Sequence, residues 1–135
     1  MKLAILTGVL LNTIFVQLSN DGLNNVSKKN VLIDGYDVVS YFENKVEMGK
    51  SQFQYNYNNT TLWFSSKAHR DKFASQPENY FPQYGGWCAY AMGNDGSKVS
   101  INPKTYLVEN GKLYLFYNKL LTNTLNLWKE EGPEV

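Results

Sequence analysis

Cysteine and histidine are almost absent from this sequence. Its 135 residues contain one cysteine, Cys88, and one histidine, His69. A single cysteine cannot form an intramolecular disulfide, and no Cys-x-x-Cys spacing that would enforce a metal site is present. A site that needs a thiol or an imidazole must therefore use these two residues.

Charge is also scarce. Lys and Arg number 13 against 12 Asp and Glu, charged residues make up 19% of the chain, and no basic stripe is present. Nucleic-acid binding needs clustered positive charge to neutralise phosphates, so we exclude it. The chain lacks a Gly-rich phosphate loop, and its apolar segments lack paired carboxylates for acid–base chemistry. Catalysis is therefore the minority hypothesis.

Long hydrophobic runs are missing apart from one near the N-terminus. Lys2 precedes apolar residues over 3–11 and 14–16. This pattern is typical of a signal peptide over residues 1–19, and it is shorter than the roughly 20 apolar residues of a membrane span. An uncleaved anchor and an internal core segment are the alternatives. We expect an exported protein, periplasmic or secreted, of the bacterial cell envelope, with no membrane span after signal removal.

The rest of the chain predicts a polar linker over residues 20–30 and a single α+β domain over 31–131, with two β-hairpins packed against about three helices. Asn-Gly between two apolar runs is the strongest short-range hairpin signal, and Asn-Asn also tolerates the positive φ of a tight turn. The predicted hairpins are residues 53–57 with 60–64, joined by Asn58-Asn59, and residues 106–108 with 113–117, joined by Asn110-Gly111.

Three further segments are predicted to be helical: a short turn over 35–42, residues 65–76, and an amphipathic closing helix over 120–128. Asp37 can cap the first segment, and Ser65 or Ser66 can cap the second. His69 lies four residues before Phe73 and shares its helix face, so it points inward or toward the rim of a pocket. Leucines at helical spacing, Leu120 and Leu121 among them, form the apolar face of the closing helix.

His69 and Cys88 are the candidate metal ligands. An imidazole and a thiolate suit copper or zinc, and a site with only two protein ligands favours Cu(I), so copper is the preferred ion. The two donor atoms would then lie within about 4 Å, because metal–nitrogen and metal–sulfur bonds are about 2.0 and 2.3 Å. The alternatives are a buried, inert Cys88 and a His69 that is hydrogen-bonded within the core.

A Ser-His-Asp set is available from Ser65 or Ser66, His69 and Asp37. No Gly-x-Ser-x-Gly turn presents either serine, so we assign no catalytic residue. Buried tyrosine hydroxyls need partners, and the many phenols predict an internal polar network or a small pocket. The candidate ligand-binding residues are Tyr36, Asp37, Tyr41, Tyr84 and Trp87.

Four collinear motifs resemble the YHS domain family: GYDVVSYF over 35–42, WFSSKAHRDKF over 63–73, PENY over 77–80 and PQYGGWCAYA over 82–91. The likeness covers about residues 34–128 and is greatest to the exported, stand-alone branch, whose biochemical role is largely undefined. Related domains on copper-transporting ATPases carry cysteines thought to bind metal. The matching positions here are Ser40, Ser65 and His69, so the resemblance does not carry those thiolate ligands over to this chain.

Together these features predict a non-catalytic module that binds a small ligand or a metal ion. The alternatives are an enzyme that uses His69 and Cys88 as a thiolate–imidazole pair, and a purely structural or protein-interaction domain whose partner is unknown.

Overall fold

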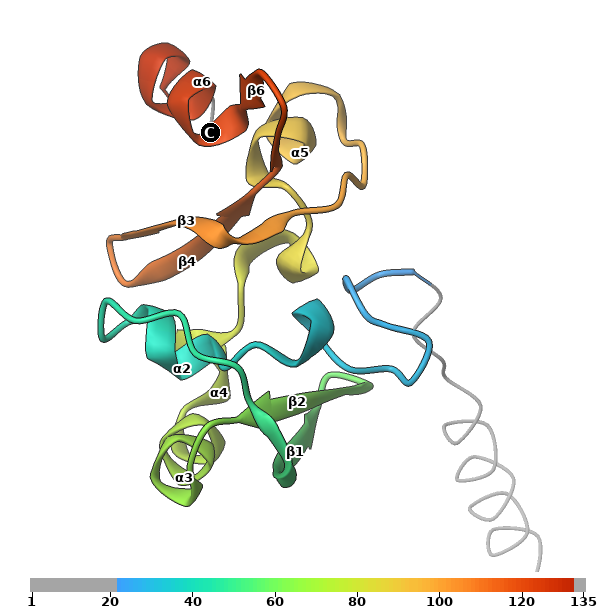
Figure 1. The fold of residues 1–135 in the computed structure, drawn as a ribbon, viewed down its shortest axis with the longest axis vertical. Helices are drawn as coiled ribbons and strands as arrows, with labels where there is room; N and C mark the ends of the chain where they lie inside the picture. Colours follow the sequence, from blue (N-terminus) through green and yellow to red (C-terminus); the bar gives the residue numbers. More distant parts are fainter. Residues whose placement is uncertain (1–21, 133–135) are drawn as a thin grey trace, which may run out of the picture.

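The computed structural model describes residues 22–132, and the predicted signal peptide lies outside this range (Figure 1). The described residues form an α+β fold with five α-helices and three two-stranded antiparallel sheets, which confirms the predicted class. In chain order the elements are η1 (Ile33–Gly35), α2 (Val38–Tyr41), β1 (Lys50–Tyr57), β2 (Thr60–Phe64), α3 (Lys67–Ser75), α4 (Pro77–Tyr80), η2 (Gln83–Gly86), α5 (Ala89–Asp95), β3 (Asn102–Glu109), β4 (Lys112–Phe116), β5 (Asn118–Lys119), β6 (Thr122–Asn123) and α6 (Thr124–Glu131), where η marks a 3₁₀ helix.

The two predicted hairpins are present. β1 pairs with β2 across Asn58 and Asn59, whose φ angles are 56° and 58°, and β3 pairs with β4 across Asn110 and Gly111. α3 begins after Ser66, whose Oγ accepts the backbone N–H of His69 at 3.1 Å, and Pro77 follows its end. These turns and caps form where the sequence predicts them because Asn, Gly and Ser satisfy local backbone geometry.

Two hydrophobic clusters fill the interior. The larger joins α2, β2, α3 and β4, and Phe73 is the one buried side chain of α3. The smaller is formed by Ala89, Phe116 and Trp128, from α5, β4 and α6. Figure 1 shows α3 at one end of the molecule, α5 and α6 at the other, and the β3–β4 hairpin between them. None of the helices in the described range is long and apolar enough to cross a membrane.

Residues 24–30, which fall within the predicted linker, pack on the domain. The backbone N–H of Asn25 donates to the Gly85 carbonyl at 2.8 Å, and the Thr61 N–H donates to the Asn30 carbonyl at 2.9 Å. Asn24 is buried. The polar composition of this stretch serves hydrogen bonding to the domain surface rather than solvation alone.

The predicted closing helix begins later than expected. Leu120 and Leu121 do not lie on its apolar face; they form the turn between β5 and β6 and are fully exposed, at 101% and 103%. Asn123 caps α6 by accepting the Leu125 N–H at 3.0 Å, and the Thr124 N–H and hydroxyl both donate to the Tyr117 carbonyl. These bonds fix the helix start at Thr124, so the leucine spacing before it is not helical.

Candidate functional site

Asp37 is the most heavily hydrogen-bonded side chain around the predicted site. It is fully buried and occupies the N-cap of α2, where its Oδ1 accepts the backbone N–H groups of Val39 at 2.8 Å and Ser40 at 3.3 Å. Aspartate is a preferred N-cap because its carboxylate satisfies the unpaired donors of the first turn. The predicted cap of this segment is therefore confirmed.

The second oxygen of Asp37 joins three separate elements. Its Oδ2 accepts the backbone N–H of Ser65 at 2.9 Å and the Ser65 hydroxyl at 2.7 Å, and it lies 2.6 Å from Nδ1 of His69. Counting both oxygens, one buried carboxylate makes five hydrogen bonds. Asp37 thus ties the start of α2 to the end of β2 and the first turn of α3.

His69 lies between two carboxylates. Its Nε2 is 3.2 Å from Oε1 of Glu43, whose other oxygen is 3.6 Å from Nζ of Lys72. Burial lowers the pKa of His69, but the hydrogen bond and charge of Asp37, followed by those of Glu43, outweigh it and raise the pKa above its ordinary value. The two carboxylates therefore favour the protonated ring, in which both nitrogens are donors.

This arrangement differs from a catalytic triad. In a triad, one ring nitrogen accepts the serine proton while the other donates to the aspartate. Here the Ser65 hydroxyl donates to Asp37, and it lies 3.3 Å from the same Nδ1 that Asp37 binds, while Nε2 faces Glu43. The Ser66 hydroxyl is used as the α3 cap. No free ring nitrogen faces either serine as a base.

Cys88 lies in a different part of the molecule. It is fully buried before α5, its Sγ accepts the Tyr117 N–H at 3.3 Å, and the Thr124 hydroxyl is 3.4 Å away. None of these partners contacts His69, which belongs to the opposite end of the molecule on α3 (Figure 1). The structure does not bring the two predicted metal ligands together. Among residues 22–132, no group of three or more His, Cys, Asp and Glu side chains could hold a metal ion.

The five predicted ligand-binding residues divide into an interior and a surface set. Asp37 and Tyr41 are interior: the Tyr41 hydroxyl donates to the Pro103 carbonyl at 2.6 Å, and its ring packs edge-on against Tyr106. Burial, followed by Tyr36, Tyr106 and Asp37, raises the pKa of Tyr41. Tyr36 is half-buried beside this group. The Tyr41 hydroxyl is thus bound to a backbone carbonyl, while the hydrogen bonds of Asp37 go to Val39, Ser40, Ser65 and His69 and include no phenol.

Tyr84 and Trp87 reach the surface at η2. Tyr84 is 39% exposed and adopts left-handed backbone angles, φ 58° and ψ 31°. The Trp87 indole N–H donates to the carbonyl of Leu23, itself 67% exposed, at 3.2 Å. Burial raises the pKa of Tyr114, and the nearby Tyr84 phenol raises it further. We call Leu23, Tyr84, Trp87 and Tyr114 the aromatic surface.

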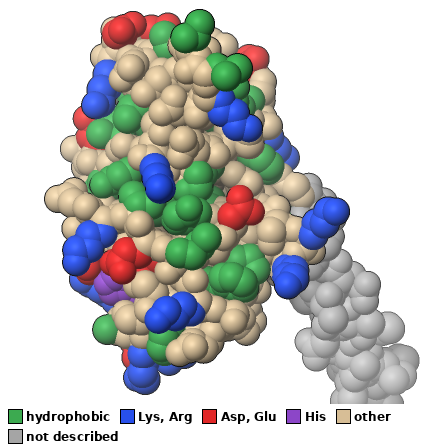
Figure 2. Space-filling model, viewed as in Figure 1, with side chains coloured by type: hydrophobic (Ala, Val, Ile, Leu, Met, Phe, Trp, Pro, Cys, Tyr) green, Lys and Arg blue, Asp and Glu red, His purple; other side chains and the backbone are tan. Residues whose placement is uncertain are grey.

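Hydrophobic side chains also gather over the middle of the face shown in Figure 2, at the level of η2 and the β3–β4 hairpin. Sequence reasoning identified Tyr84 and Trp87 but missed Leu23 and Tyr114, because these come from segments 61 and 30 residues away from Tyr84 with no shared motif. It also missed Glu43 as a partner of His69, which is 26 residues away.

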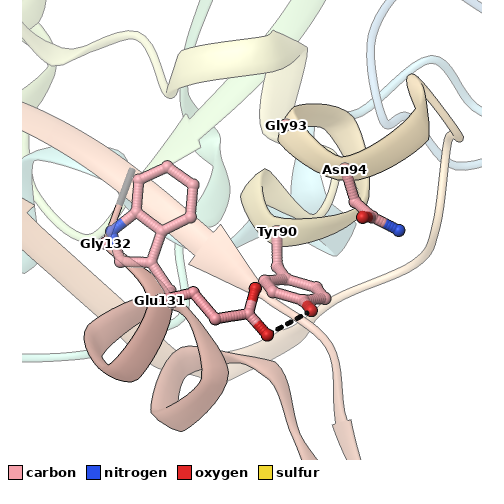
Figure 3. Close-up of a pocket in the computed structure, with 6 residues that line it drawn as sticks. Tyr90, Gly93, Asn94, Glu131 and Gly132 are labelled. Carbon is pink, nitrogen blue, oxygen red and sulfur yellow. Dashed lines mark hydrogen bonds between the residues drawn. The ribbon is translucent and has the colours of Figure 1, made fainter. Parts of the chain in front are cut away.

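A small pocket near the C-terminal helix is a weaker candidate. Tyr90, Gly93, Asn94, Trp128, Glu131 and Gly132 line it, and the Tyr90 hydroxyl donates to Oε1 of Glu131 at 3.1 Å (Figure 3). Its volume is about 90 Å³, well below the roughly 300 Å³ of the smallest usual ligand pockets. The pocket has room for water or a small ion rather than for an organic ligand.

Comparison with known proteins assigns no family to this arrangement. No protein-family model, no curated protein and no solved structure matches the chain. The resemblance to the YHS domain family therefore stays a prediction that rests on the sequence motifs.

Proposed function

We propose that this chain is a non-catalytic binding domain of the bacterial cell envelope, and that its ligand contacts the aromatic surface around Tyr84. The observation that carries this proposal is the backbone of Tyr84. A bulky side chain in the left-handed region costs about 1–2 kcal/mol relative to ordinary backbone, so its presence there needs a reason. Strain of this kind gathers at functional sites.

The other positive-φ residues show how unusual Tyr84 is. Nine non-glycine residues of the described range have positive φ, and six of them are Asn or Asp, which tolerate this conformation. Ile33, Tyr84 and Leu120 are the exceptions. Ile33 is 2% exposed and packs in the main core, so folding explains it. Folding does not explain an exposed tyrosine where asparagine or glycine would be easier to accommodate.

The turn that presents Tyr84 is firmly held. Gly85 and Gly86 continue the left-handed run with φ of 62° and 86°, and a Cβ on Gly85 would lie 2.5 Å from Oδ1 of Asn24. Asn25 binds the carbonyls of both glycines, through its backbone N–H and its side-chain amide. Tyr84 is therefore pre-positioned, which lowers the entropic cost of binding.

The chemistry of the surface suggests a ligand with a flat, apolar face, such as an aromatic ring or the face of a sugar ring. Tyrosine and tryptophan offer a large rigid contact area together with a polar edge, and they are enriched in binding interfaces for this reason. Leu23 extends the apolar area beside them. The surface carries no imidazole or thiolate, so it fits binding rather than covalent chemistry.

The alternatives have less support. A thiolate–imidazole enzyme would need His69 and Cys88 together, and copper binding by the pair would need the same proximity. Each side chain is instead enclosed by its own hydrogen-bond partners. The polar atoms of His69 and Cys88 are hydrogen-bonded within the domain, which supports a structural role for each residue.

Chemical-shift mapping with a library of indoles, phenols and monosaccharides tests the proposal. We expect perturbed amides around Tyr84, Trp87 and Tyr114, and loss of those shifts in Tyr84→Gly. Asn44→Gly is the matched control, because Asn44 is exposed with φ 58° and relaxes the same backbone region without removing an aromatic ring. Shifts centred on His69 or Cys88, or unchanged binding by Tyr84→Gly, would overturn the proposal.

A further inference from the structure

Two consecutive leucines form the tip of the shortest hairpin. Leu120 and Leu121 join β5 to β6, and both side chains are fully exposed, at 101% and 103%. We call these two residues the leucine tip. Leu121 borders a shallow hollow beside Asn126 and Leu127. Exposed single leucines are ordinary on protein surfaces, but an adjacent pair of fully exposed leucines at a hairpin turn is not.

The other two hairpins show what folding alone requires at such a turn. They use Asn58-Asn59 and Asn110-Gly111, which accept positive φ and place no apolar side chain in water. The leucine tip places Leu120 at φ 54°, where leucine is strained, and adds two apolar side chains in water. Two of the three hairpin turns therefore consist of residues that favour positive φ, whereas the third consists of two leucines, which do not.

The hairpin closes without help from the leucines. Asn118 pairs with Asn123, and Lys119 pairs with Thr122 across the two strands. The Thr124 hydroxyl donates to the Tyr117 carbonyl at 2.7 Å, and the side-chain amide of Asn118 donates to the Thr105 hydroxyl at 3.0 Å. These polar contacts anchor the base of the hairpin, so the leucines are free to serve a contact outside the chain.

Exposed lysines lie near the tip, on its own strand and on the strand beside it. Lys119, directly before the tip, is exposed, and so is Lys104 on β3, the strand to which β5 is bonded through Asn118. Neither lysine forms an ion pair within residues 22–132. The tip is thus an apolar pair next to unpaired positive charge.

We propose that the leucine tip docks this domain on the surface of an anionic lipid bilayer. The leucines enter the apolar boundary of the lipids, and Lys119 and Lys104 meet the lipid phosphates. Two side chains are too small for a stable protein interface, which buries about 1,000 Å² or more. A second copy seated on the same tip would oppose Lys119 to its own counterpart. A bilayer accepts a small insertion and supplies the complementary charge.

The test must separate the tip from any lipid binding by the N-terminal apolar segment, so the full chain is labelled at one position at a time. Thr122→Cys carries an environment-sensitive fluorophore beside the tip, and Lys112→Cys carries it beside the Asn110-Gly111 turn as the control. Both positions are exposed, whereas native Cys88 is buried and stays unlabelled. The probes are vesicles of phosphatidylethanolamine with phosphatidylglycerol, and vesicles of phosphatidylcholine alone.

We expect a blue shift and enhanced emission at position 122 with the anionic vesicles, a weaker response with phosphatidylcholine, and no response at position 112. Leu120→Asn with Leu121→Gly, which imitates the Asn-Gly turn, should weaken the vesicle response at 122 by about tenfold or more. Equal responses at both positions, no response at 122, or an unchanged response in the double variant would overturn the proposal. A shift at 122 that grows with protein concentration without vesicles would assign the tip to a second copy and overturn it too.

Discussion

The Asp37–His69 network and the two exposed apolar sites, Tyr84 and the leucine tip, use their residues in opposite ways. The network contains the groups that carry chemistry by type, a carboxylate, an imidazole and a hydroxyl, and each is paired inside the domain. The exposed sites contain side chains of little chemical reactivity: Tyr84 and Leu120 have left-handed backbone angles, and Leu120 and Leu121 are fully exposed. Folding thus accounts for the first region and does not account for the second.

This difference favours the exposed sites over the network as the place of function. A histidine, an aspartate and a serine in contact suggest a catalytic site. Here, however, the serine and the histidine both bind the buried Asp37 carboxylate and stabilise its charge. The residues that folding leaves unexplained are a tyrosine and two leucines.

Asp37→Ala should have the largest effect. It removes five hydrogen bonds and leaves His69 and the N–H groups of Ser65, Val39 and Ser40 without their buried carboxylate partner, so we expect a loss of about 3–5 kcal/mol in the free energy of unfolding. Urea unfolding followed by tryptophan fluorescence measures it. Asp71→Ala is the control, because Asp71 forms only exposed ion pairs and should change little. A loss below about 1 kcal/mol would contradict a structural role for the network.

His69→Gln should cost less, about 1–2 kcal/mol, because the amide keeps part of the hydrogen bonding. The loss should depend on pH. The folded-state pKa of His69 is raised, so its stabilising contribution is fully present below the unfolded pKa of about 6.5 and disappears as pH rises through the folded pKa. The free energy of unfolding of the unmodified protein and of His69→Gln is compared from about pH 5 to about pH 9, a range that spans the unfolded pKa of histidine. A gap that is constant or widens toward high pH would contradict a raised pKa of His69 in the folded protein.

The features that sequence could predict are those whose cause is local. The N-caps of Asp37 and Ser66, the turns at Asn58-Asn59 and Asn110-Gly111, and the inward side of α3 each depend on residues within one turn or hairpin. The sequence predicts too early a start for the closing helix, because the leucine spacing resembles a helix, whereas the cap that fixes its start is Asn123.

The features that sequence could not predict depend on distant segments. Glu43 meets His69 across 26 residues, and Cys88 meets Thr124 across 36. No periodicity or motif encodes such pairs, so the predicted joint metal site of His69 and Cys88 rests on residue type alone. The strain at Tyr84 is equally invisible, because only the folded turn fixes its φ angle.

Glycine substitutions at Tyr84, Leu120 and Ile33 compare the exposed positive-φ residues with a buried one. Tyr84→Gly and Leu120→Gly should each leave stability unchanged or raise it by about 0.5–1 kcal/mol, since relief of left-handed strain exceeds the entropy that glycine adds to the unfolded chain. Ile33→Gly, at φ 41°, relaxes the same strain but empties part of the core and should destabilise by about 3 kcal/mol. Thermal unfolding compares the three. Destabilisation by Tyr84→Gly or Leu120→Gly similar to that by Ile33→Gly would show that folding needs these side chains.

Copper uptake should show the smallest effect, because the donors of His69 and Cys88 do not meet. Two ligands of one Cu(I) ion lie within about 4 Å of each other, and these side chains are instead bound to separate partners on α2 and on β4 with α6. Titration with Cu(I) against a competing chelator should therefore give equal, low uptake for the unmodified protein, His69→Gln and Cys88→Ser. The thiol offers an independent check: a buried Cys88 should react with a disulfide reagent at a rate limited by opening of the fold, and rapidly in urea. Tight binding of one copper ion that either substitution abolishes would restore the metal site and return function to the region that folding otherwise explains.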